Sequence, residues 1–153
     1  MRVGLISDTH GLVRPEVLLA FEGVDRILHA GDVGGGDVLA ILARVAPVEA
    51  VFGNVDVPGD PRLTDHLYDR IGGVSVHVSH GHELGSPTPA RLLARYDADV
   101  LVYGHTHKPL IQRAAARLVV NPGAAGPRRF DIQPSVAILT IRSGRAEAEL
   151  IPL

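Results

Sequence analysis

The sequence contains no cysteine. This absence excludes disulfide bonds, zinc sites built on thiolates and a cysteine nucleophile, and it leaves the redox compartment open. The chain also lacks an apolar run of about 18 residues, so no transmembrane helix is expected. Its start shows no basic segment followed by an apolar stretch and a cleavage site. By default, we expect a cytoplasmic protein without a membrane partner.

Aromatic residues are scarce as well. They make up 4% of the 153 residues, whereas hydrophobic residues make up 46% and charged residues 21%. Val, Leu, Ile and Ala must therefore form the core. A chain of this length is expected to fold as a single domain over residues 1–153 and to bury about 70% of its unfolded surface.

The sequence has little net charge. The value of −2 gives no strong signal for nucleic-acid binding. A site that holds two dications is locally less negative than this count indicates, so anionic substrates are not excluded.

A repeated pattern is present, in which an apolar run ends in Asp, Asn or His. The first run, residues 1–7, is apolar and partly β-branched, which is typical of a buried strand. Five such runs end in Asp8 with His10, Asp32, Asn54, His80, and His105 with His107. Because open α/β sheets carry their sites at the carboxyl ends of strands, the pattern predicts one shared site.

These seven side chains offer only oxygen and imidazole nitrogen as ligand atoms. Such ligands suit Mn²⁺, Fe, Zn²⁺, Ni²⁺ or Co²⁺ and do not choose among them. Seven ligands are too many for one ordinary ion, but they fit two ions that share a bridging carboxylate. Two such ions can activate a water and hold both the attacking and the leaving oxygen of a phosphoryl displacement.

The same residues form ordered motifs that resemble those of the calcineurin-like metallophosphoesterases. These motifs are Asp8-x-His10, Gly31-Asp32, Gly53-Asn54, His80-Gly81 and Gly104-His105-Thr106-His107. The short chain and its tail motif resemble the small YfcE-like phosphodiesterase branch; that motif is Asn121-Pro122-Gly123-Ala124, followed by Pro127-Arg128. The resemblance covers nearly the whole chain, and the ordered set is more specific than any single motif.

The resemblance implies a fold and a function. The implied fold is of the α/β class, a four-layer α-β-β-α sandwich of two mixed β-sheets flanked by helices. The implied enzyme is a dinuclear metal-dependent phosphoesterase, first of all a phosphodiesterase that hydrolyses a small phosphodiester by attack of a metal-activated hydroxide. Its cofactors are two divalent metal ions, with Mn²⁺ as the first choice and Ni²⁺, Zn²⁺, Fe or Co²⁺ as alternatives. Small relatives often self-associate, so a homo-oligomer is one option.

The resemblance also assigns the ligands. It gives Asp8, His10 and His107 to one ion and Asn54, His80 and His105 to the other, with Asp32 as the bridge. The residues expected to act in catalysis are Asp32, Asn54, His80 and His82.

One position departs from the family pattern. Val55 stands where catalytic relatives often carry the His that is thought to protonate the leaving oxygen. Since general acid catalysis is worth roughly 10²–10⁴-fold, we expect weaker catalysis on poor leaving groups. His82 and Asp56 are the alternative proton donors, and Arg128 is placed by the resemblance where it could meet a substrate phosphate.

The sequence also allows other roles for three histidines and other functions for the protein. His29 either orients a ligand or is a packed structural residue, and His66 and His77 fit structural or surface roles. The protein could be a phosphomonoesterase instead of a diesterase. It could also be a non-catalytic protein-binding scaffold, since a retromer subunit that resembles these enzymes serves chiefly in protein contacts. The intact histidines disfavour that role.

The element order begins as strand, helix, strand, helix, strand, which is typical of a parallel α/β sheet. We expect helices at 12–22, with Val13, Val17, Leu18 and Phe21 on one face, at 38–44 with Asp37 as its cap, and at 89–96. A loop is expected over 55–65. The further strands are expected at 25–30, 48–52, 66–70, 74–79, 99–103, 110–113, 117–120, 135–141 and 146–151.

Overall fold

Two mixed β-sheets form the centre of the molecule. A computed structural model describes the backbone of residues 1–153 and the side-chain surroundings of all of them except residue 36. The six-stranded sheet runs β11 (Arg145–Pro152), β10 (Ser135–Arg142), β1 (Arg2–Ile6), β2 (Arg26–His29), β3 (Val48–Val51) and β4 (Leu63–Thr64). The five-stranded sheet runs β5 (Leu67–Ile71), β6 (Val74–Val78), β7 (Val100–Val102), β9 (Arg117–Asn121) and β8 (Leu110–Ala114).

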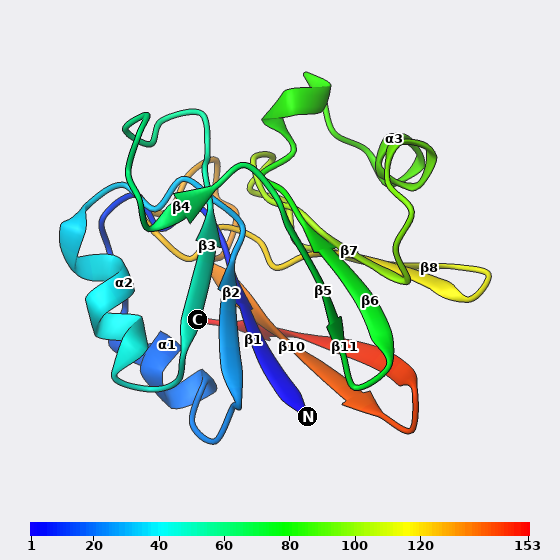
Figure 1. Cartoon of the computed structure of the whole chain (residues 1–153). Coiled ribbons are helices and arrows are strands. Elements are labelled where there is room, and N and C mark those ends of the chain that lie inside the picture. Colours follow the sequence, from blue (N-terminus) through cyan, green and yellow to red (C-terminus); the bar gives the residue numbers. More distant parts are fainter.

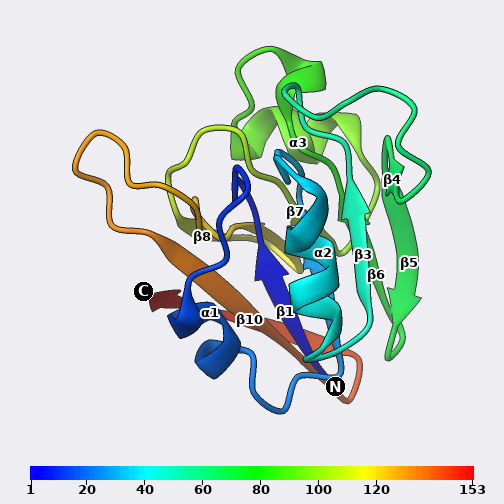
Figure 2. The same ribbon diagram turned by 90° about the vertical axis from the view of Figure 1, so that its left-hand side faces the viewer.

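Helices cover the outer face of each sheet. The six-stranded sheet carries α1 (Pro15–Ala20) and α2 (Gly36–Ala43), which Figure 2 shows in front of its strands. The five-stranded sheet carries α3 (Pro89–Arg95) and a single 3₁₀ turn, η1 (His82–Leu84), on the opposite side of the molecule (Figure 1). The expected four-layer α-β-β-α sandwich is therefore confirmed.

Three separate clusters of buried side chains lie between these four layers. The largest fills the space between the sheets and includes Leu5, Val76 and Val102. A second cluster packs α1 and α2 against the six-stranded sheet, and a third, around Leu92, packs α3 against the other sheet. The central strands are apolar on both faces because both faces are covered.

The parallel strands of each sheet end at the same edge of the molecule. In the six-stranded sheet β1, β2, β3 and β4 are parallel neighbours, and in the other sheet β6, β7 and β9 are. Their carboxyl ends lie at the top of Figure 1, where the two sheets face each other. Every loop that carries a predicted ligand leaves from this edge.

The expected strands are all present, but three details differ. The first helix spans only Pro15–Ala20 because Pro15, at its first turn, sets its start, and Leu18 is 36% exposed although we expected it on the buried face. The cap of α2 is Gly35, so Asp37 lies in the first turn of the helix. The expected loop over 55–65 contains β4, which adds a short parallel strand to β3.

Among the described residues, no helix is long and apolar enough to cross a membrane.

Candidate metal centre

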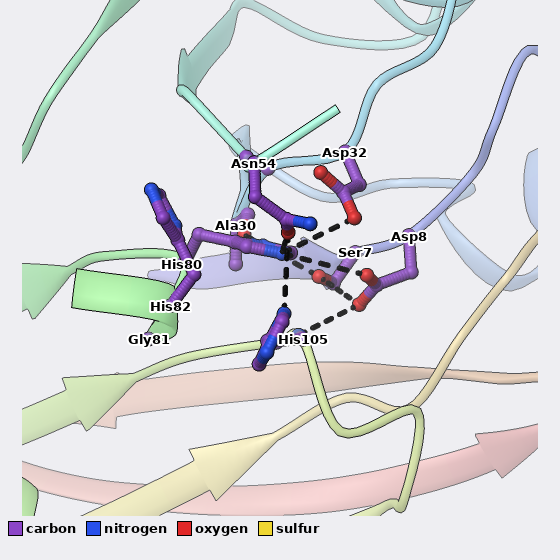
Figure 3. Close-up of polar contacts among 12 residues, drawn as sticks. Ser7, Asp8, Ala30, Asp32, Asn54, His80, Gly81, His82 and His105 are labelled. Atoms are coloured by element: carbon purple, nitrogen blue, oxygen red, sulfur yellow. Dashed lines mark hydrogen bonds and ion pairs between the residues drawn. The ribbon is translucent and has the colours of Figure 1, made fainter. Parts of the chain in front are cut away.

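The structure brings all seven predicted ligands into one cluster. The seven residues lie in the loops that follow five strands. These are Asp8 and His10 after β1, Asp32 after β2, Asn54 after β3, His80 after β6, and His105 and His107 after β7. Figure 3 shows the side chains of Asp8, Asp32, Asn54 and His105 gathered around His80. Two sets of three, Asp8 with His10 and His107 and Asp8 with Asp32 and His80, have donor atoms within 4.8 Å of one another.

The backbone at the cluster is unusual. The left-handed region is occupied by Asp8, His10, Asp32, His105 and His107, with φ angles between 46° and 70°. For a residue with a side chain this conformation costs about 1–2 kcal/mol. Such strain concentrates at functional sites, where the surrounding structure imposes it.

Glycines precede three of the predicted ligands because the loops approach one another closely. A Cβ on Gly53 would collide with the Asp32 carboxylate, and one on Gly104 would collide with Ser7 Oγ and Asp8 Oδ2. A Cβ on Gly31 would stand 2.7 Å from Nδ1 of His80. These glycines therefore bring the carboxylates and imidazoles of different loops into contact.

The first side of the centre consists of Asp8, His10 and His107. Oδ1 of Asp8 lies 3.3 Å from Nε2 of His107 and 4.0 Å from Nε2 of His10. The carboxylate is fully buried, and its other oxygen accepts hydrogen bonds from Ser7 Oγ at 2.6 Å and the His105 amide at 3.1 Å. Oδ1 of Asp8 and Nε2 of His10 are buried without a hydrogen-bond partner.

The second side consists of Asn54, His80 and His105. Nδ1 of His80 donates to the carbonyl of Ala30 at 2.7 Å, which directs Nε2 into the cluster. Nε2 of His80 lies 3.1 Å from Asn54 Oδ1, and that oxygen lies 3.2 Å from Nδ1 of His105. These donor atoms are hydrogen-bonded to one another, whereas Oδ1 of Asp8 and Nε2 of His10 on the first side make no hydrogen bond.

Asp32 lies between the two sides. Its Oδ2 is 3.3 Å from Nε2 of His80 and 3.8 Å from Nε2 of His10, while Oδ1 accepts a hydrogen bond from the Val55 amide at 3.1 Å. Asp8 also reaches His80, at 3.8 Å, so both carboxylates contact histidines of both sides. This placement suits a bridging carboxylate, and the assignment of that role to Asp32 stays a prediction.

The ionisation of the cluster follows from these contacts. Burial raises the pKa of Asp32, but the hydrogen bond and charge of His80 outweigh it and lower the pKa to about 2. Burial opposes the charged form of His80, yet Asp32 and Asp8 raise its pKa above the usual 6.5. Burial dominates at His10 and His105 and lowers the pKa of each. A charged His80 donates from Nε2, so its proton stands where a metal ion would bind.

The two alternative proton donors differ in their surroundings. The His82 ring stands 5.3 Å from the His80 ring and 6.4 Å from the His105 ring, with 37% of its side chain exposed at the edge of the second side (Figure 3). Asp56 instead accepts hydrogen bonds from the backbone amides of Val33, Gly34 and Gly53. Asp56 therefore fastens two loops together, and this role disfavours it as the acid.

His29 is a packed structural residue that also fixes the loop after β1. Its Nδ1 accepts from the Gly31 amide at 3.1 Å, so the proton on Nε2 is donated to Thr9 Oγ1 at 3.0 Å, and Thr9 in turn donates to the Val33 carbonyl. Complete burial lowers the pKa of His29 to about 4, which keeps the ring neutral. His77 is likewise buried, with its ring stacked at 3.9 Å on Tyr96.

Two supporting residues were not singled out from the sequence. Ser7 donates to Asp8, and Nδ2 of Asn121 donates to the Gly104 carbonyl and to Thr106 Oγ1, which holds the loop that carries His105. The tail motif that contains Asn121 is part of the family resemblance, but only the structure shows that this Asn reaches the loop after β7. Arg128, also in this region, donates to the Asp131 carbonyl at 3.4 Å and lines a small hollow beside His107.

The chain is similar in sequence and in fold to several known proteins. The profile of the calcineurin-like phosphoesterase superfamily domain matches residues 1–144. A probable metallophosphoesterase of Methanothermobacter thermautotrophicus is 39% identical, over 99% of this chain and 92% of the relative. A phosphodiesterase of Methanocaldococcus jannaschii is 27% identical, over 80% of this chain and 83% of that protein. Among solved structures, Vps29 of Entamoeba histolytica complexed with Zn²⁺ is 25% identical and has a TM-score of 0.78, with 99% of each chain covered.

Proposed function

The chain belongs to the calcineurin-like phosphoesterase superfamily, and from this premise we propose that it is a metal-dependent phosphodiesterase with a dinuclear centre that hydrolyses a small phosphodiester. A relative named as a probable metallophosphoesterase and another named as a phosphodiesterase support the reaction class. The ions we propose are Mn²⁺ first, with Ni²⁺, Zn²⁺, Fe or Co²⁺ as alternatives, because the ligand atoms are borderline-hard oxygen and nitrogen.

The observation that carries the proposal is the pair of buried polar atoms without partners. Oδ1 of Asp8 and Nε2 of His10 face the interior of the cluster and make no hydrogen bond. A buried polar group left unsatisfied costs about 1–3 kcal/mol. Metal coordination would remove this cost, since a carboxylate oxygen and an imidazole nitrogen are both good ligands.

In this proposal the residues of each side would hold one ion, and Asp32, which contacts histidines of both sides, would be shared. Bound metal would supply a hydroxide nucleophile by lowering the pKa of a water and would neutralise charge on the phosphoryl oxygens. The rings of His80 and His105, on the second side, lie next to the exposed His82. His82 is the proposed donor of the leaving-group proton, because Val55 has no proton to donate and Asp56 is occupied by backbone amides.

Hydrolysis of bis(p-nitrophenyl) phosphate and of p-nitrophenyl phosphate tests the proposal. Metal-stripped protein is reloaded with Mn²⁺, Ni²⁺, Zn²⁺ or Mg²⁺ and its metal content is measured. We expect metal-dependent turnover that favours the diester, and we expect Asp32→Asn to lose bound metal and nearly all turnover. The control is Asp97→Asn, an exposed carboxylate before β7 and thus at the other end of that strand.

Three results would count against parts of the proposal. Preference for the monoester would identify a phosphomonoesterase. Full activity and unchanged metal content in Asp32→Asn would contradict the assignment of the centre. Two bound ions without turnover on either substrate would favour a protein-binding scaffold, because Vps29 of Entamoeba histolytica, which was solved in complex with Zn²⁺, has a similar fold.

A further inference from the structure

A cavity of about 220 Å³ lies beside the second side of the metal centre. It lies between the loop that follows β2 and the loop that follows β3, next to the start of α2. Figure 1 shows these two loops at its top left. Its apolar lining comes from Val33, Leu39, Val55, Val57 and Leu63. We call it the Val55 cavity.

The wall of the Val55 cavity is continuous with the centre. Val33 directly follows Asp32 in the chain, and Val55 directly follows Asn54. Two residues that line the cavity are therefore chain neighbours of predicted ligands. The amide of Val55 donates to Oδ1 of Asp32 at 3.1 Å. The loop that carries Val55 therefore joins the cavity to the centre through a direct contact with Asp32.

The shape of the cavity is fixed by Asp56. Its carboxylate accepts from the amides of Val33 and Gly34 on one loop and of Gly53 on the other, at 2.8–3.2 Å. These bonds hold the two walls at a set separation and also occupy the charge of Asp56. On the remaining rim, Asp60 is paired with Arg62 at 2.8 Å. The carboxylates beside the cavity are thus engaged, and its lining offers mainly apolar contact.

Two valines that line the cavity are exposed, so their side chains are accessible to a ligand. Val55 is 54% exposed and Val57 is 74% exposed. The facing wall includes Gly34 and Gly35, which have no side chain and leave the backbone open to a flat group. An apolar cavity of about 150 Å³ is large enough to hold benzene.

We propose that the Val55 cavity binds a flat apolar substituent of the substrate, an aryl or heteroaryl group attached to the phosphoryl group through its ester oxygen. This inference rests on the proposed function and adds a substrate class to it. The cavity supplies binding, whereas the centre supplies the chemistry, so the cavity selects among phosphoesters by the organic group that they carry.

Binding of two non-hydrolysable probes tests this independently of turnover. Phenylphosphonate and methylphosphonate are titrated into the Mn²⁺-loaded protein by calorimetry. We expect the phenyl compound to bind about tenfold more tightly, since apolar contacts of this size discriminate by about 10–200-fold. Val57→Asp should abolish the preference, and Val57→Ile should keep it. The matched control is Leu19→Asp on α1, because Leu19 is an equally exposed apolar residue, at 72%, outside the cavity.

Hydrolysis of bis(p-nitrophenyl) phosphate gives a second measurement. Val57→Asp should raise KM with little change in kcat, because it removes binding without altering the centre. Equal affinity for the two phosphonates in the unmodified protein, including no binding of either, would overturn the inference, as would a preference that survives Val57→Asp. A clear phenyl preference in a protein that hydrolyses no ester would instead overturn the proposed function and leave the cavity assignment in place.

Discussion

The two sides of the metal centre are built from similar residues but are stabilised differently. On the first side, Asp8, His10 and His107 all have a left-handed backbone, and two of their buried donor atoms have no partner. On the second side, His105 is the residue with a left-handed backbone, and the donor atoms of Asn54, His80 and His105 contact one another.

This difference indicates that the two sides gain unequally from a metal ion. An ion on the first side satisfies atoms that otherwise have no partner, so its binding recovers a cost of about 1–3 kcal/mol for each. An ion on the second side must first displace the contacts of Asn54 with the two histidines. The first side should therefore bind its ion more tightly, and the negative charge of Asp8, where the second side has the neutral Asn54, should add to the difference.

The largest expected effect is the loss of metal binding at one side of the centre while the other side still binds its ion. Calorimetric titration of metal-free protein with Mn²⁺ should show two steps that differ in affinity by about 10–100-fold, since each 1.4 kcal/mol is a factor of ten. Asn54→Ala should remove the weaker step and keep the tighter one. His10→Ala should remove the tighter step.

The control for this titration is His66→Ala, because His66 lies next to His77 and Tyr96 and outside the cluster. Two equal steps in the unmodified protein would contradict the comparison. Loss of the tighter step in Asn54→Ala would reverse the order of the two sides.

An intermediate effect is expected from pH. A histidine must lose its proton to bind a metal ion. Asp32 and Asp8 raise the pKa of His80 above 6.5 against the opposing effect of burial, whereas burial lowers the pKa of His10 below 6.5. As the pH falls, His80 is therefore protonated first, and the affinity of the second side should decrease about tenfold per pH unit below that pKa.

The first side should keep its affinity to a lower pH. Measuring Mn²⁺ content after dialysis at pH 8, 7, 6 and 5 checks this order, because one ion should be lost at a higher pH than the other. Asn54→Ala, which keeps only the first side, should show the lower transition alone. Simultaneous loss of both ions at one pH would show that the two sides do not differ in this way.

The sequence predicts which residues meet, and it does so through the order of strands. Asp8 and Asp32 end neighbouring parallel strands, so their proximity follows from the buried runs before them. Asp and His tolerate the left-handed region better than most residues other than glycine, but they adopt it only rarely, so the residue types at positions 8 and 10 do not predict it. It is imposed by contacts between distant segments, such as that of the His105 amide with Asp8, 97 residues apart.

The same reason explains why Ser7 and Asn121 were not assigned as supporting residues. A Ser before Asp8 and an Asn at the end of β9 are ordinary residues at the ends of strands, and their hydrogen bonds form only after both sheets are in place.

The bounds of the helices were less predictable than those of the strands. The run over 12–22 has a helical spacing of apolar residues, but the helix ends at Ala20 and leaves Leu18 and Leu19 exposed.

The smallest expected effect concerns stability without metal. His10→Asn replaces a residue in the left-handed region by one that tolerates it better and removes a buried nitrogen without a partner. The free energy of unfolding of the metal-free protein should increase by about 1 kcal/mol, which raises the Tm by about 2–4 °C in a chain of this size.

His80→Asn, on the second side, should lower the Tm because it removes the hydrogen bond to Ala30 and the contact with Asp32. His82→Asn serves as the control, since His82 is exposed and does not have a left-handed backbone. Thermal unfolding in the presence of a chelator measures all three, and a lower Tm in His10→Asn would mean that the first side is not strained. Added Mn²⁺ should reverse the ranking of His10→Asn and the unmodified protein, because only the unmodified protein can gain the full binding energy of the ion on that side.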